Sequence, residues 1–247
     1  MTEADHACRE VVRQHDKDMF LSTLFAPETA QPQLFALHAF ACELARIPVL
    51  VNDPQIGEIR LQWWADTLAS PDRGKGSGHP VAEGLASAIR VHGLPVEALQ
   101  QMIEARRFDL YADAMPDMTA LEAYFGETQS ALMQLCCLVL DQPAASSAAQ
   151  AAGLAGVAFG LARRMCVAPS EKLVPVGGNR ADVLSLAQTR LDEARLASKQ
   201  IPKSLLPALL PLALAEHYLA AARAGRTDVP QWRRQWRLWR ASRSERF

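Results

Sequence analysis

The sequence predicts an all-α protein, and three observations support this fold class. Apolar residues recur at helical spacing along the 247 residues, as Leu34, Leu37 and Leu44 illustrate. Strand-like patterns are nearly absent, apart from the short segment Leu173–Val176. Hydrophobic residues make up 49% of the chain and charged residues 21%, which is typical of a globular protein and excludes a disordered one. No composition shift marks a boundary, so we expect a single domain over residues 1–247.

Proline, glycine and capping residues divide the chain into predicted helices. Their ranges are 5–22, 29–46, 55–69, 79–92, 95–113, 120–141, 146–167, 182–199, 203–223 and 229–242. Pro48 and the Asn52–Pro54 turn are expected to end the second helix. Thr119 and Glu122 are expected to form a capping box at the start of the sixth helix, and Asp182 to cap the eighth.

The segment Gly74–Gly78 has the glycine-rich composition of a phosphate-binding loop and contains a lysine. Such a loop follows a strand and leads directly into a helix. Here no strand-like segment precedes it, and Pro71 and Pro80 flank it. We therefore interpret this segment as a flexible connection.

The charge of the chain is unevenly distributed. A formal net charge of -1 gives no argument for nucleic-acid binding, but six arginines oppose one glutamate between Pro230 and Phe247, a net charge of +5. The five cysteines show no C-x-x-C spacing, which suits reduced thiols in the cytosol. No apolar signal region stands at the N-terminus, and the most apolar run, Ala131–Leu140, is half of the roughly 20 residues that span a bilayer. We expect a cytoplasmic protein, either soluble or peripheral at the inner face of the plasma membrane.

The predicted helix 229–242 carries three tryptophans on one face. Trp232, Trp236 and Trp239 follow the spacing i, i+4, i+7. The arginines that accompany them are Arg233, Arg237 and Arg240. An aromatic row beside cationic side chains suits a helix that lies on anionic lipid or contacts a partner protein. The alternative is that the tryptophans dock into a groove of their own domain, and base stacking on nucleic acid is a third, less favoured alternative.

A series of short motifs follows the chain from its first helix into its seventh. In order they are Phe20–Pro27, Ala36–Phe40, Leu61–Trp64, His79–Ala82, Glu104–Leu110, Leu121–Tyr124 and Gly156–Leu161. Each motif is weak alone, but their collinear order resembles the squalene/phytoene synthase family. The resemblance implies an isoprenoid-synthase-like helical bundle around a central cavity.

Synthases of this family hold magnesium with two aspartate-rich motifs on facing helices, and this chain departs from both. The segment Ala45–Val49 stands where the family has its first motif, and Ala162–Pro169 stands near the second. Magnesium would have no carboxylate ligands there, so we expect no catalytic residues, no metal site and no cofactor. This favours a protein that is not an enzyme. The alternative is a divergent prenyltransferase that uses magnesium to condense isoprenoid diphosphates.

Arginines stand at or near the positions where the family has its aspartates. The candidate cavity residues are Arg46, Arg60, Arg106, Arg163, Arg164 and Asp109, the last of which matches an acidic position of the family. Guanidinium groups bind phosphate or carboxylate without a metal, so we expect the ligand to be an anionic lipid, an isoprenoid diphosphate or an acidic side chain of a partner protein. The alternative is that these arginines pair with Glu43, Glu104 and Asp109.

Three further segments resemble one branch of the family, which contains the mitochondrial complex I assembly factor with a phytoene-synthase-like fold. They are Phe35–Leu44, Ile56–Trp64 and Glu127–Leu132. This resemblance implies a role in the assembly of respiratory complex I (NADH:quinone oxidoreductase), with its subunits or assembly intermediates as partners. His38 and His79 lack a ligand partner at i+3 or i+4, so we expect core or capping histidines.

Overall fold

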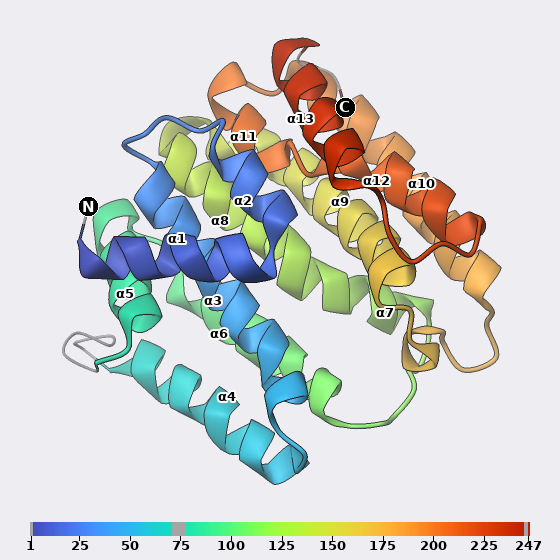
Figure 1. Ribbon diagram of the computed structural model, residues 1–247, viewed down its shortest axis with the longest axis horizontal. Helices are drawn as coiled ribbons and strands as arrows, with labels where there is room; N and C mark the ends of the chain where they lie inside the picture. Colours follow the sequence, from blue (N-terminus) through green and yellow to red (C-terminus); the bar gives the residue numbers. More distant parts are fainter. Residues whose placement is uncertain (1, 71–77, 245–246) are drawn as a thin grey trace. The chain divides into compact units, whose positions relative to one another are not determined.

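The computed structural model describes residues 2–70, 78–244 and 247 (Figure 1). The described residues form helices and turns but no strand, which confirms the all-α fold class. The helices group into two compact units, Met1–Ala112 and Asp113–Phe247. A single domain over residues 1–247 therefore stays a prediction. Residues 71–77, with most of the glycine-rich segment, lie outside the described residues.

The first unit is organised around its third helix. In order, its elements are α1 (Glu3–His15), α2 (Lys17–Thr23), α3 (Gln31–Leu50), α4 (Pro54–Ala69), α5 (Pro80–His92), α6 (Val96–Arg106) and the 3-10 helix η1 (Arg107–Leu110). Helix α3 packs against α1, α4 and α5 (Figure 1). Its Leu37 and Phe40 side chains are fully buried, as is Leu61 of α4. Burial of these side chains provides the hydrophobic stabilisation of the unit.

Two helix boundaries of the first unit differ from the prediction. The predicted helix 5–22 is interrupted at Asp16, which ends α1 and accepts a hydrogen bond from the Met19 amide at the start of α2. Pro48 does not end α3, because it lies in the last turn of the helix and removes a single helical hydrogen bond there. The helix continues to Leu50, and Asp53 then caps α4.

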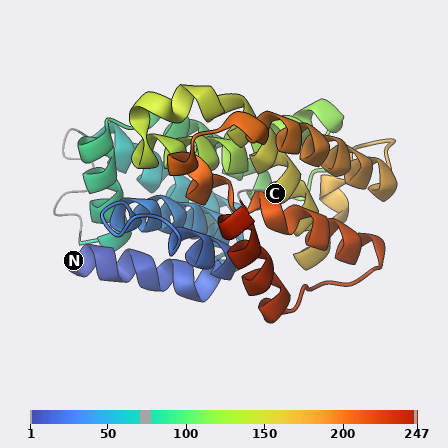
Figure 2. The same cartoon turned by 90° about the horizontal axis from the view of Figure 1, so that it is seen from above.

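The second unit is organised around a long central helix. In order, its elements are α7 (Met118–Phe125), the π-helix η2 (Gly126–Ser130), α8 (Ala131–Leu140), α9 (Gln142–Val167), the 3-10 helix η3 (Glu171–Leu173), α10 (Arg180–Ala197), the 3-10 helices η4 (Ser198–Gln200) and η5 (Lys203–Leu205), α11 (Leu206–Leu209), α12 (Leu212–Arg223) and α13 (Gln231–Ser244). Helix α9 packs against α8, α10 and α12 (Figures 1 and 2).

The caps of two helices in this unit also differ from the prediction. Asp117 caps α7 by accepting a hydrogen bond from the Ala120 amide, so the helix begins one residue before Thr119. Asn179 caps α10, and the predicted cap Asp182 instead completes the capping box as its third helical residue. Both shifts move the cap to a preceding Asp or Asn in extended conformation, a residue type that caps as well as the predicted one.

Glycines on α9 allow a close helix crossing. A Cβ atom at Gly156 would lie 2.3 Å from the Cα atom and 2.4 Å from the amide nitrogen of Ser130. A Cβ atom at Gly160 would lie 2.5 Å from the Phe125 ring. The Ser130 hydroxyl donates a hydrogen bond to the Gly153 carbonyl across the same crossing. The glycine motif of the sequence thus has a packing function, because it brings α9 into contact with the α7–η2 segment.

Among the described residues, three helical stretches are long and apolar enough to cross a membrane, judged by length and composition. They are Gln31–Leu50, Gln142–Val167 and Lys203–Arg223, and 56%, 61% and 72% of their most apolar windows are buried inside the structure. The comparison with bilayer thickness in the sequence used only the uninterrupted apolar run Ala131–Leu140. The three helices named here do not meet that criterion because they combine apolar residues with a few polar ones.

The crossing at Gly156 can be tested by substitution. We expect Gly156→Ala to destabilise the protein by about 1–3 kcal/mol, because the added methyl group meets the backbone of Ser130 and cannot move it cheaply. Urea unfolding followed by circular dichroism measures the change.

Gly153→Ala on the same helix is the matched control. Its Cβ atom would lie 3.5 Å from the side-chain Nε2 atom of Gln134, which is an ordinary contact. The higher helix propensity of alanine should therefore leave stability unchanged or raise it by up to ~1 kcal/mol. Equal effects of the two substitutions would contradict the packing role of Gly156.

Candidate functional site

The predicted cavity residues are distributed over the two units. Arg46, Arg60, Arg106 and Asp109 belong to the first unit, and Arg163 and Arg164 belong to the second. Within the first unit, the structure brings together Arg106 and Asp109. The other members each lie in a different local environment.

Arg46 pairs with an acid of its own helix. Its Nη1 atom lies 3.2 Å from Oε1 of Glu43, one turn earlier on α3, and the Arg46 side chain is 34% exposed. A partly exposed pair of this kind contributes no more than about 1 kcal/mol to stability. The segment Ala45–Val49, which stands where the family has its first aspartate motif, forms the last turns of α3.

Arg106 and Asp109 form the more buried pair. Nη1 of Arg106, at the end of α6, lies 3.0 Å from Oδ2 of Asp109 in η1, and their side chains are 13% and 9% exposed. Opposite charges this close and this buried neutralise each other locally. The pairing considered as an alternative from the sequence is therefore present for Arg106 as well as for Arg46.

Arg107 is a charged residue that the sequence reasoning missed. It forms ion pairs with Glu58 of α4 and with Glu104, the latter at 2.7 Å, and Glu58 also accepts a hydrogen bond from the Tyr111 hydroxyl at 3.0 Å. These contacts connect α4 to α6 and η1. Helical spacing predicts the Glu104–Arg107 pair, but no local sequence pattern predicts the contacts of Glu58, because Glu58 lies far from Arg107 and Tyr111 along the chain.

Gly57 lies at the contact of the same elements. A Cβ atom at Gly57 would lie 2.4 Å from the Leu110 side chain. The glycine of the Ile56–Trp64 segment and the leucine of the Glu104–Leu110 segment therefore pack directly against each other. Two motifs that supported the family resemblance are explained by this packing.

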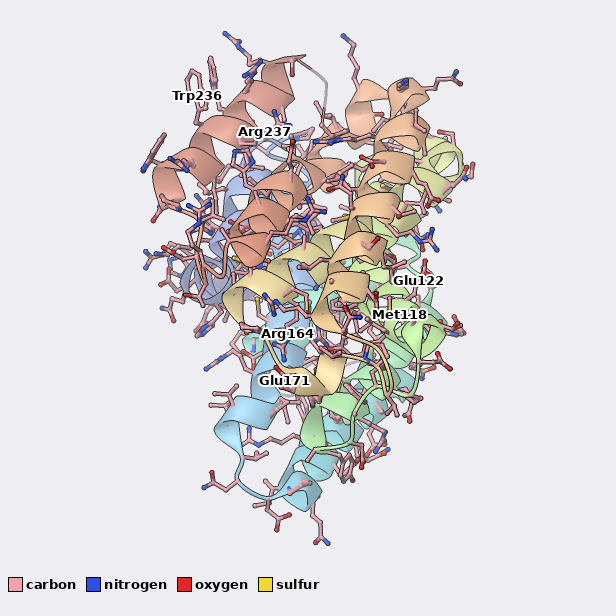
Figure 3. The ribbon with its side chains drawn as sticks, turned by 90° about the vertical axis from the view of Figure 1, so that its right-hand side faces the viewer. Met118, Glu122, Arg164, Glu171, Trp236 and Arg237 are labelled. Carbon is pink, nitrogen blue, oxygen red and sulfur yellow. The ribbon has the colours of Figure 1, made fainter. Side chains whose placement is uncertain are left out.

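Arg60 and Arg164 are not neutralised in the same way. Arg60 is exposed on α4, and we find no ion-pair partner for it among the described residues. The guanidinium of Arg163 lies 5.7 Å from the centroid of the Phe159 ring, a cation–π contact within α9. Arg164 lies on the last turn of α9, before Glu171 of η3 (Figure 3), and within the described part of the chain no acid pairs with it.

The acids of the described residues do not fit the magnesium site that the family resemblance implies. Glu43, Glu58 and Asp109 are each engaged with an arginine. Over residues 2–70, 78–244 and 247, no group of three or more His, Cys, Asp and Glu side chains is placed to hold a metal ion. Magnesium needs several oxygen ligands in octahedral geometry. The absence of a bound metal itself stays a prediction.

The C-terminal helix α13 docks on its unit through residues other than its tryptophans. Leu238 and Ala241 are fully buried, and the Arg237 guanidinium donates a hydrogen bond to the Ala213 carbonyl of α12 at 3.1 Å. In contrast, the exposed fractions of Trp232, Trp236 and Trp239 are 63%, 58% and 45%. The tryptophans do not dock into a groove of their own unit, which was the alternative considered from the sequence.

The outward side of α13 is an ordered array of rings and guanidinium groups. Trp236 and Trp239 stack with their ring centroids 5.0 Å apart at an interplanar angle of 26°. The Arg233 guanidinium lies 5.1 Å from the Trp232 ring, and Arg243 lies 5.7 Å from the Trp239 ring. Figure 3 shows Trp236 pointing away from the unit, whereas Arg237 lies between α13 and α12.

Comparison with known proteins identifies the family. The family model described as "Squalene/phytoene synthase" matches residues 12–165, which is more than half of the chain. The chain belongs to the squalene/phytoene synthase family. The resemblance drawn from the collinear motifs is thereby confirmed.

Two curated relatives in this family carry the name "NADH dehydrogenase (ubiquinone) complex I, assembly factor 6". The protein from Bos taurus is 30% identical over 87% of this chain and 72% of its own length. The protein from Homo sapiens is 28% identical over the same shares. These relatives confirm the similarity to the assembly-factor branch.

Solved structures confirm the isoprenoid-synthase-like fold. The squalene synthase HpnC from Alicyclobacillus acidocaldarius superposes with a TM-score of 0.67 at 19% identity and covers 90% of this chain and 94% of its own. A dehydrosqualene synthase in complex with a ligand reaches 0.71 at 14% identity over 98% and 96%. YisP from Bacillus subtilis reaches 0.69 at 16% identity over 96% and 95%. At these identities the likeness describes the fold alone.

The two histidines take the structural positions that we expected. His79 caps α5 by accepting a hydrogen bond from the Ala82 amide, and its ring contacts Trp63 and Trp64. His38 lies in the core of the first unit with 8% of its surface exposed. Burial lowers the pKa of His38 to about 4, although the negative charge of Asp16 opposes the shift.

The pKa of His38 predicts a loss of stability in mild acid. Below pH 6.5 the unfolded chain binds a proton at this residue, whereas the folded protein binds it only near pH 4, so stability falls between these values as the pH falls. At pH 5 we expect a loss of about 2 kcal/mol relative to pH 7.5 from this residue. The measurement is the free energy of unfolding in urea at both pH values.

His38→Phe removes the titrating group and keeps a core side chain of similar size. The loss on going from pH 7.5 to pH 5 should therefore be smaller in the variant by about 2 kcal/mol. An identical pH dependence in both proteins would show that His38 does not titrate as inferred.

Proposed function

We propose that this protein assists the assembly of respiratory complex I, NADH:quinone oxidoreductase, and that it does so without synthase activity. The observation that carries this proposal is the similarity to relatives named as complex I assembly factor 6, at 28–30% identity over 86–87% of the chain. Its partners would be complex I subunits or assembly intermediates. Its location would be the cytoplasm, at the inner face of the plasma membrane.

The charges near the end of α3 support a role without synthase chemistry. Ionising an allylic diphosphate requires its negative charges to be neutralised as it leaves, which the synthases achieve with magnesium held by aspartates. In this chain Arg46 stands in the first of those positions, and its nearest acid, Glu43, is paired with it. Near its C-terminal end, helix α9 carries Arg163 and Arg164 where the second aspartate motif would stand.

We further propose that the fold binds an anionic isoprenoid or lipid directly through guanidinium groups. Arg60 and Arg164 support this part of the proposal, because neither has an ion-pair partner within the described residues. Arg46 and Arg106 are weaker candidates, since each already faces an acid. Arginine can hold a phosphate with two parallel hydrogen bonds and needs no metal to do so.

Genetic deletion tests the assembly role. In the organism that carries this gene together with NADH:quinone oxidoreductase, we expect deletion to lower the amount of assembled complex I and its NADH oxidation in membranes. The wild-type gene should restore both. Assembled complex at wild-type levels in the deletion strain would overturn the proposal.

A divergent prenyltransferase is the second candidate, and the fold shared with the synthase structures favours it. Purified protein is incubated with farnesyl or geranylgeranyl diphosphate and magnesium, and released pyrophosphate is measured. Under our proposal no magnesium-dependent release occurs. Release at enzymatic rates would support the prenyltransferase and contradict a protein without catalysis.

Ligand binding through guanidinium groups predicts a thermal shift without magnesium. An isoprenyl diphosphate at ten times its Kd should raise the melting temperature by roughly 3–6 °C in the presence of EDTA. Arg60→Gln should reduce this shift if the first unit holds the site, and Arg164→Gln should reduce it if the second unit does. The exposed Arg90 on α5 provides the control, since Arg90→Gln should leave the shift unchanged. A melting temperature that millimolar ligand does not change would contradict the binding proposal.

A further inference from the structure

Helix α13 has two sides with different contacts. Leu238 and Ala241 each follow a tryptophan by two residues, which places them about 200° around the helix from that tryptophan. Both are fully buried against the unit, whereas the preceding Trp236 and Trp239 are 58% and 45% exposed. The tryptophan row therefore faces directly away from the surface on which the helix docks.

The docked side holds the helix in this orientation. Besides the two buried apolar residues, Arg237 donates to the Ala213 carbonyl and lies 3.9 Å from Glu216, and Arg234 reaches the Tyr218 hydroxyl at 3.5 Å. Two arginines of the helix are thus used for docking on α12. The helix is already formed and oriented, so contact through its outer side would require no folding step.

The outer side combines exposed indole rings with unneutralised positive charge. Three large aromatic side chains that are each 45–63% exposed lie on one side of the helix, which is unusual on the surface of a soluble monomer. Arg233, Arg240 and Arg243 are exposed beside this row. Between Gln231 and Ser244 the sequence contains no Asp or Glu, so no acid of the helix itself compensates these charges.

The shape of the row favours a flat partner over a pocket. The three tryptophans follow i, i+4, i+7 spacing along one line of a straight helix, and two of them are stacked on each other. A protein groove would be expected to take anchors of different depth into separate pockets. Indole rings prefer the boundary between lipid headgroups and acyl chains, and neighbouring arginines reach the phosphates of anionic lipids.

We infer that α13 is a membrane-surface helix, with Trp232, Trp236 and Trp239 inserted at the headgroup level of an anionic bilayer and Arg233, Arg240 and Arg243 on its phosphates. The inference concerns this helix alone and does not depend on a role in complex I assembly. Its ligand is the lipid surface and not a single lipid molecule, since the contacts lie along the whole helix.

Co-sedimentation of the full chain with vesicles tests the inference. The wild-type protein should bind vesicles of phosphatidylcholine with phosphatidylglycerol, and bind vesicles of phosphatidylcholine alone much more weakly. High salt should weaken the binding, because it screens the arginines. A wild-type protein that stays in the supernatant with both vesicle types would overturn the inference.

Two sets of variants separate the aromatic and the charged contributions. The first set is Trp232→Ala, Trp236→Ala and Trp239→Ala, and the second is Arg233→Gln, Arg240→Gln and Arg243→Gln, each combined in one protein. Each triple variant should bind the anionic vesicles roughly 100-fold more weakly than the wild type. Unchanged binding by both triple variants would also overturn the inference.

Matched controls remove the same number of exposed apolar side chains or positive charges outside α13. Val49→Ala, Ile59→Ala and Leu196→Ala remove three exposed apolar side chains, and Arg90→Gln, Lys199→Gln and Arg223→Gln remove three positive charges. Both control proteins should bind like the wild type. If they lose binding as strongly as the α13 variants, the binding is not specific to α13 and the inference fails.

A measurement on the wild-type protein covers the case in which a variant does not fold. Lipids brominated on their acyl chains should quench the indole emission when the vesicles are anionic, because bromine quenches only at close range. No quenching would exclude inserted tryptophans.

If the tryptophan variant binds vesicles normally but no longer captures complex I intermediates, the partner of α13 is a protein and the lipid inference is wrong.

Discussion

Helix α9 approaches the α7–η2 segment so closely that a single methyl group at Gly156 would overlap the backbone of Ser130. This approach determines the arrangement of the second unit, because α8, α10 and α12 all pack around the same long helix. The hydrogen bond from Ser130 to the Gly153 carbonyl is made possible by the same short distance. The first unit has a comparable contact where Gly57 of α4 meets Leu110 of η1. In both units, segments that mark the family in sequence serve to bring helices together.

Three positive charges of the first unit are compensated within the protein. Arg46, Arg106 and Arg107 each face at least one acid, and the Arg106–Asp109 pair is largely withdrawn from water. In a synthase, acids of this kind would be available to cations that also hold the substrate. Here the acids are already bound to arginines. The family's fold is therefore present together with acids that arginines already neutralise.

Much of the fold could be predicted from the sequence, because helical spacing and capping residues are local properties. The class, the order of the helices and the family followed from such patterns, and α3, α4 and α9 lie within a few residues of the predicted ranges. Errors arose where two residues could serve the same purpose, as with Asn179 and Asp182 at the start of α10. The contact of Arg107 with Glu58 could not be predicted, since it joins distant segments. The periodicity placed three tryptophans on one face of α13, but it could not tell which face docks. Leu238 and Ala241 make that contact, although the tryptophans are the larger apolar residues.

The π-helix η2 has a consequence for the register of the helices on either side of it. A π-turn accommodates one residue more than an α-turn, so it absorbs a one-residue insertion that would otherwise rotate the following helix by about 100°. Thr128 and Ser130 are both buried within this turn, and α8 continues from it with Leu132, Leu135 and Cys136 in the core. A relative that lacks one residue between Gly126 and Ser130 would therefore form a regular α-turn there and keep the same buried face of α8. Alignments of this family should place a one-residue gap at this turn and leave the hydrophobic pattern on either side of it unchanged.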